Sequence, residues 1–83
     1  MKTLNHLTQE IFNIVRTINT DIPIDSSENL LSEGYIDSFG IANIVPALEE
    51  YFQIDLSPED IIPENFTSID SMRNMIQRKM REG

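Results

Sequence analysis

Three segments of this chain space their apolar residues at the period of an α-helix, and no segment alternates as a β-strand does. In residues 4–18 the spacing predicts an amphipathic helix, and the same pattern predicts a second helix over 38–52 and a last one from Ile69 to the C-terminus. The fold class is therefore predicted to be all-α. The three apolar stripes are Leu4, Leu7, Ile11, Ile14, Val15 and Ile18; Ile41, Ile44, Val45, Leu48, Tyr51 and Phe52; and Ile69, Met72, Ile76 and Met80.

The segments between these helices carry turn and capping signals. The motif Ser57-Pro58-Glu59-Asp60 is a capping box with proline at the first helical position, so a short helix containing Ile61 and Ile62 is expected before Pro63 ends it. Thr67-Ser68-Ile69-Asp70 is a second capping box, at the start of the last helix. The 83 residues allow one domain, 1–83, built as a bundle of three main helices and one short helix.

The connection over residues 21–36 is long for a compact domain, and such loops are often functional. It contains five aliphatic residues, which a solvated linker does not need, so we expect it to fold back and bury them. A single helical turn is expected around Asn29. The five aliphatic residues are Ile22, Ile24, Leu30, Leu31 and Ile36.

The charge distribution restricts the partners. Six Lys+Arg against fourteen Asp+Glu give a net charge of −8, which argues against nucleic acid, because phosphate binding needs a basic patch. Residues 17–72 contain twelve acids and no Lys or Arg. This span either only keeps the chain in solution or projects a field that steers basic partners toward it.

Several chemistries are disfavoured by composition. The chain has no cysteine and one histidine, His6, so a self-contained enzyme is not expected. A metal site is not expected either, because an EF-hand loop starting at Asp21 would have Pro23 at its third position and Ser26 at its sixth. No uncharged run approaches the roughly 20 residues of a membrane span, and no secretory signal is apparent, so we expect a cytoplasmic monomer.

The segment from Gly34 to Gly40 is the strongest candidate site. Asp37 is a candidate N-cap of the second helix, and Ser38 follows it as the first helical residue. A phosphate ester on Ser38 would meet free backbone N–H groups and the positive end of the helix dipole. The alternative is that Asp37 and Ser38 only start a helix, since both residue types favour that position.

These residues carry a resemblance to the acyl carrier protein family, which includes peptidyl and aminoacyl carriers. Gly34…Asp37-Ser38-Phe39 resembles the family's G-x-x-D-S-[LMF] attachment motif, and Leu48-Glu49-Glu50…Phe52 resembles the end of its second helix. Leu56-Ser57-Pro58-Glu59-Asp60 resembles its short helix, and Phe66-Thr67-Ser68-Ile69 the entry to its last helix. The resemblance covers nearly the whole chain and implies an acyl-carrier-like four-helix bundle.

The resemblance also implies a function. Ser38 would receive 4′-phosphopantetheine from coenzyme A through a separate phosphopantetheinyl transferase, with Asp37 capping the helix and orienting the serine. The thiol of the arm would hold an acyl or aminoacyl group as a thioester, for delivery to a downstream acyltransferase or synthase of fatty acid, polyketide or nonribosomal peptide biosynthesis. The expected partner face consists of Phe39, Ala42, Pro46, Glu49 and Glu50.

Two features depart from fatty-acid-type carriers. Such carriers usually have acids where this chain has Gly40 and Asn43, so the resemblance favours stand-alone carriers loaded by an adenylating ligase, such as D-alanyl carriers or those of secondary metabolism. Pro46 lies inside the second helix, where it lacks the N–H that would bond to Ala42.

Two other hypotheses stay open: a small acidic helical adaptor that binds a protein partner without a cofactor, and a calcium-binding module.

Overall fold

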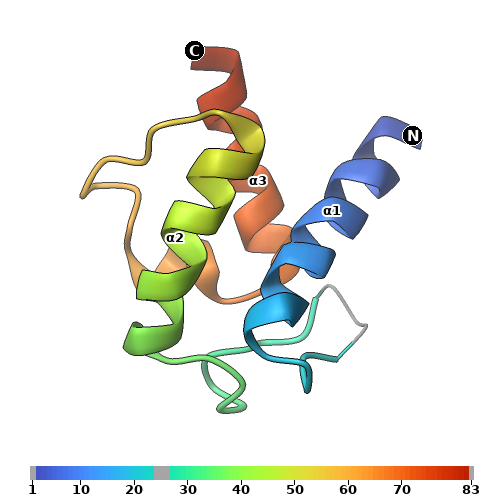
Figure 1. Ribbon diagram of the computed structural model, residues 1–83, viewed down its shortest axis with the longest axis vertical. Coiled ribbons are helices and arrows are strands. Elements are labelled where there is room, and N and C mark those ends of the chain that lie inside the picture. Colours follow the sequence, from blue (N-terminus) through green and yellow to red (C-terminus); the bar gives the residue numbers. More distant parts are fainter. Residues whose placement is uncertain (1, 24–26, 83) are drawn as a thin grey trace.

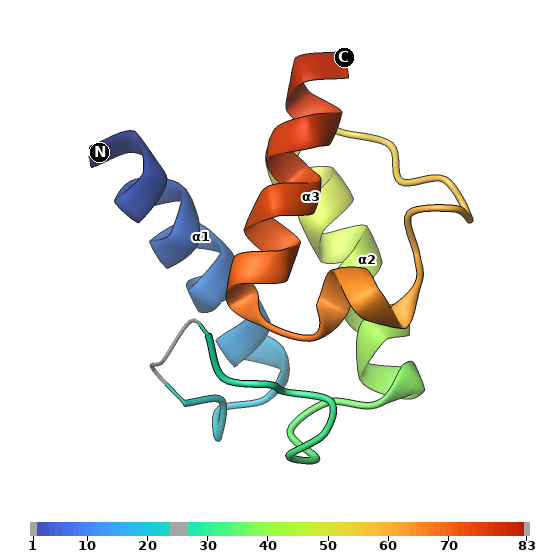
Figure 2. The same cartoon turned by 180° about the vertical axis from the view of Figure 1, so that it is seen from behind.

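The computed structural model describes residues 2–23 and 27–82, with the side chains of residues 2–5 left out. It contains the helices α1 (Lys2–Ile18), α2 (Ser38–Phe52) and α3 (Ile69–Glu82) and the short 3₁₀-helix η1 (Pro63–Phe66), and no strand within the described residues. Figure 1 shows α3 behind α1 and α2, and Figure 2, seen from the opposite side, shows it in front of them; in both views the described parts of the long first loop run beneath the helices. The all-α prediction and the three main helices are confirmed, and α2 continues through Pro46.

The three helices enclose one apolar core, which the predicted stripes supply. Ile11, Leu48 and Ile76, one from each main helix, have no exposed surface. Met80, which the sequence pattern placed in the last stripe, is instead 50% exposed. The side chain of Leu4 and all of Ile24 lie outside the described residues. The other fully buried residues are Val15, Leu30, Ile44, Phe66, Ile69, Met72 and Met75.

The first loop folds into this core, as its aliphatic content predicts. Ile22, Leu30 and Ile36 are buried, and Leu31 packs partly buried against the core. The backbone N–H of Glu33 donates to the Asn29 carbonyl at 3.1 Å, which makes the expected single turn. The loop is therefore an integral part of the fold.

The short helix differs from the prediction. Residues 58–60 form only a turn, and the helical segment is η1, which Pro63 begins and does not end. The physical reason is that a residue before proline is pushed out of the α region. Ile62 accordingly has extended backbone angles, φ −123° and ψ 152°, so a helix over 58–62 could not be completed.

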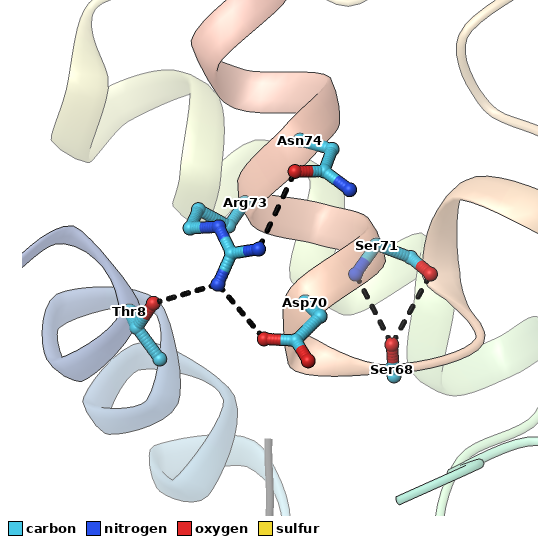
Figure 3. Close-up of polar contacts among 6 residues, drawn as sticks. All are labelled: Thr8, Ser68, Asp70, Ser71, Arg73 and Asn74. Carbon is cyan, nitrogen blue, oxygen red and sulfur yellow. Dashed lines mark hydrogen bonds and ion pairs between the residues drawn. The ribbon is translucent and has the colours of Figure 1, made fainter. Parts of the chain in front are cut away.

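The start of α3 also differs, by one residue. Ser68, and not Thr67, is the N-cap, because the backbone N–H of Ser71 donates to Ser68 Oγ at 3.1 Å (Figure 3). Figure 3 also shows Arg73 joining α3 to α1: its Nη1 donates to Thr8 Oγ1 at 3.2 Å and lies 2.8 Å from Asp70 Oδ1. These contacts tie the first turns of α3 to α1.

Candidate functional site

The first turn of α2 is capped by Asp37. Its backbone is extended, with φ −137° and ψ −170°, and its Oδ1 accepts the N–H of Gly40 at 2.9 Å. Its own carbonyl accepts the N–H of Ile41 at 2.9 Å. This is the geometry of an N-cap, in which one orphan amide of the helix start is satisfied by a side chain.

Ser38 is the first residue of α2, and its side chain is exposed. The segment before it is anchored on both sides. Gly34 has a φ of +82°, which suits glycine and lets the chain turn, and Ile36 is buried. Asn19, at the end of α1, donates from its side-chain amide to the carbonyl of Tyr35. Ser38 is therefore presented to solvent from a backbone that is held in place.

One flank of Ser38 borders a small apolar pocket of about 210 Å³. Ile61 and Ile62, each 39% exposed, form its outer wall, and Ile41 and Ala42 contribute from α2. The sequence pattern predicted the two isoleucines as the apolar content of a short helix and did not indicate this role. Their adjacency was an available signal, because neighbouring residues of a helix point about 100° apart and both could not face one core.

Asp60 holds the loop that carries this wall. Its Oδ2 accepts the backbone N–H of Ser57 at 3.0 Å and the Ser57 hydroxyl at 2.9 Å, and it lies 2.9 Å from Lys79 Nζ of α3. The hydrogen bond from Lys79, followed by that from the Ser57 backbone, lowers the pKa of Asp60 to about 2. The loop is thereby tied to the last helix.

The other flank of Ser38 carries Phe39, which is 77% exposed. Phe39 borders a second pocket of about 240 Å³, together with Tyr35, Gly40 and Asn43. A Cβ at Gly40 would lie 3.3 Å from the Cβ of Ile36, which is tighter than most such contacts. A side chain at position 40 would therefore require Ile36 to shift by a few tenths of an ångström.

The remaining residues of the predicted partner face follow Phe39 along one side of α2. Ala42 and Pro46, four residues apart, are exposed there, as Phe39 is. Glu49 is half-buried, and its Oε2 accepts the backbone N–H of Leu56 at 2.9 Å. Glu50 is exposed and borders a groove shared with α1. The two adjacent glutamates therefore make different contacts, Glu49 with the loop after α2 and Glu50 with the groove.

Among the described residues, no three His, Cys, Asp or Glu side chains gather as metal ligands would. In the same part of the chain, no helix is both long and apolar enough to cross a membrane.

A protein-family model described as the phosphopantetheine attachment site matches residues 9–76. The chain belongs to this family. The matched region runs from α1 into α3 and includes the start of α2 with Asp37 and Ser38. Comparisons with curated proteins and with solved structures gave no match.

Membership identifies the chain as a carrier with 4′-phosphopantetheine as its prosthetic group. Such carriers hold the group and do not catalyse reactions themselves, and they meet a phosphopantetheinyl transferase and biosynthetic enzymes. The exposed hydroxyl of Ser38 at a helix start fits an anionic arm. The match thus favours the carrier hypothesis over a cofactor-free adaptor or a calcium-binding module.

Proposed function

We propose that Ser38 Oγ is the atom that bears the phosphopantetheine arm of this carrier. The supporting observation is the position of Ser38: it is exposed, it is the first residue of a 15-residue helix, and Asp37 caps that helix. In the transfer, the Ser38 hydroxyl forms the phosphodiester and gives its proton to the transferase, while the nucleotide part of coenzyme A leaves. The arm then supplies a thiol that holds the cargo as a thioester.

The residues around Ser38 have separate tasks in this proposal. The positive end of the α2 dipole favours the negative phosphodiester. Asp37 uses Oδ1 to bind the Gly40 N–H, so its task is to fix the direction of the first turn and with it the Ser38 side chain. Phe39 on one flank, and Ile61 and Ile62 on the other, offer exposed apolar surface to the transferase and to later enzymes.

We extend the docking surface along α2 to Ala42 and Pro46, which are exposed on the same helix. Proline removes the N–H that would bond to the Ala42 carbonyl, but both residues are exposed, so water can satisfy that carbonyl. Glu50 adds negative charge at the far end of this surface. Glu49 contributes less, because its carboxylate is engaged with Leu56.

For the cargo, we propose an acyl or aminoacyl group that a separate ligase activates as an adenylate. The support is the absence of acids at positions 40 and 43, where a malonyl-transferring system of the fatty-acid type would expect them. A side chain at position 40 would also come close to Ile36, with the two Cβ atoms 3.3 Å apart. The phosphopantetheinylated protein should accept malonyl groups poorly from a fatty-acid-type transferase, and efficient loading there would refute the cargo proposal.

The attachment site is tested by intact-protein mass spectrometry after incubation with coenzyme A, Mg²⁺ and a promiscuous phosphopantetheinyl transferase. The wild type should gain the mass of one arm, and Ser38→Ala should gain none. Ser32→Ala is the matched control, because Ser32 is also an exposed serine but lies in the turn before Gly34. Modification of Ser38→Ala, or loss of modification in Ser32→Ala alone, would contradict the assignment.

A further inference from the structure

A groove of about 700 Å³ lies between α1 and α2, on the side of α2 that faces away from the Ile61 and Ile62 wall. Each helix contributes one row of side chains at helical spacing, Glu10 to Thr17 from α1 and Ala47 to Tyr51 from α2. A groove between two such rows has the shape in which the side chains of a third helix pack. The residues that matter for its chemistry are Glu10, Ile14, Thr17, Ala47, Glu50 and Tyr51.

The groove combines an apolar floor with acidic edges. Ile14 and Ala47 are half-buried, and Tyr51, with 55% of its surface exposed, borders the same groove. The Tyr51 hydroxyl donates to Glu10 Oε2 at 3.1 Å, and His6 Nε2 lies 2.7 Å from the same oxygen. Within the described residues no contact uses Glu10 Oε1, so this oxygen can accept a hydrogen bond from outside.

None of the residues that border the groove is basic. Arg16, the basic residue of α1 nearest in sequence, donates to the Thr20 carbonyl at 3.1 Å and lies with its guanidinium carbon 5.5 Å from the centre of the Phe12 ring. It is thus engaged outside the groove. Among the described residues, His6 contacts one oxygen of Glu10, and no Lys or Arg borders the groove, so a basic residue of another protein can reach Glu50 and the second oxygen of Glu10.

We propose that this groove binds a helical segment of a partner protein that places one lysine or arginine between Glu10 and Glu50 and an apolar side chain on Ile14 and Ala47. A second copy of this chain is a poor occupant, because two molecules of net charge −8 repel each other. The occupant is a cationic amphipathic helix.

Binding in this groove leaves the start of α2 free. Ala47 follows Ser38 by nine residues, which is about 13 Å along the helix axis and about half a turn around it. The pocket beside Ser38 and the groove share no bordering residue. A partner held here keeps the carrier close while a second protein reaches Ser38, so the groove serves as a tether.

The test maps amide chemical shifts of the isotope-labelled apo protein, so it does not depend on whether Ser38 is modified. The probe is a synthetic helical peptide of alanine and leucine with two arginines beside its leucine face, compared with the same peptide carrying glutamine for arginine. We expect the cationic peptide to shift amides of residues 10–17 and 47–51 saturably, to leave Ser38 and Ile61 unshifted, and to bind more tightly than the glutamine peptide.

Reversing a charge in the groove tests more directly whether the peptide binds there. Glu50→Lys should weaken binding of the cationic peptide two- to fivefold, since exposed ion pairs are modest in strength. Glu59→Lys is the matched control: it makes the same charge change at an exposed residue of the turn over 58–60, and it should bind like the wild type. Circular dichroism verifies that both variants are folded. Equal weakening by both variants, shifts centred on Ser38, or no saturable shift would each overturn the proposal.

Discussion

Asp60 connects the loop beside Ser38 to the last helix, and replacing it tests how that loop is held. In Asp60→Asn the side chain keeps its shape but loses its charge. The contact with Lys79 Nζ at 2.9 Å then ceases to be an ion pair, while the amide oxygen still accepts from Ser57. The substitution therefore isolates the charge of Asp60 from its packing.

The magnitude follows from the pKa of Asp60, which is lowered from 3.8 to about 2 in the folded protein. One pKa unit corresponds to about 1.4 kcal/mol, so the charged form of Asp60 stabilises the fold by at most about 2.5 kcal/mol. Because the folded pKa is depressed, this stability is fully present above about pH 4 and is lost as the pH falls through about 2. The Asp60 side chain is 16% exposed, and solvent screening reduces the value to about 1–2 kcal/mol.

The assay is urea unfolding followed by circular dichroism at several pH values between about 2 and 6. Near neutral pH, Asp60→Asn should be less stable than the wild type by about 1–2 kcal/mol, and the difference should shrink toward zero as the wild-type Asp60 becomes protonated. Asp55→Asn is the control, because Asp55 is an exposed acid of the same loop, and its pH profile should follow the wild type. A difference for Asp60→Asn that does not change with pH, or no difference at all, would refute the reasoning.

Three further predictions concern the site and the core. Asp37→Ala removes the N-cap and should cost about 1 kcal/mol in thermal unfolding, and it should also slow arm transfer because Ser38 is less well oriented. Leu48→Ala leaves a cavity at a fully buried position, so the free energy of unfolding in urea should fall by about 2–5 kcal/mol. Transfer of the arm to the wild type at low transferase concentration should slow as salt rises toward 1 M, because the Debye length falls from about 8 Å to about 3 Å. A rate independent of salt would show that the acids of residues 17–72 do not steer the transferase.

The apolar spacing was sufficient to predict the three main helices, because helical periodicity is a local property of the sequence. The aliphatic content of the first loop also predicted that Ile22, Leu30 and Ile36 would be buried, because a solvated linker does not need aliphatic residues. The Asp37 cap and the position of Ser38 at the start of α2 followed from residue preferences at helix ends.

The cap of α3 depends on a contact made across the fold. The capping box predicted Thr67 as the cap, but the Thr67 carbonyl accepts the N–H of Leu30 at 2.6 Å, and its backbone is αR, where an N-cap is extended. Ser68 therefore takes the role. The short helix expected before Pro63 fails for a local reason, because proline pushes the preceding residue, Ile62, out of the α region.

The surfaces around Ser38 were decided by tertiary structure alone. Sequence patterns treated Glu49 and Glu50 as one acidic edge, yet the loop that returns after α2 brings the Leu56 N–H to Glu49 and leaves Glu50 facing α1. The same loop, tied by Asp60 to α3, carries Ile61 and Ile62 to the pocket beside Ser38. Periodicity shows which face of a helix is apolar. Which distant segment covers the edges of that face depends on how the helices pack, and this packing determines the surface around Ser38.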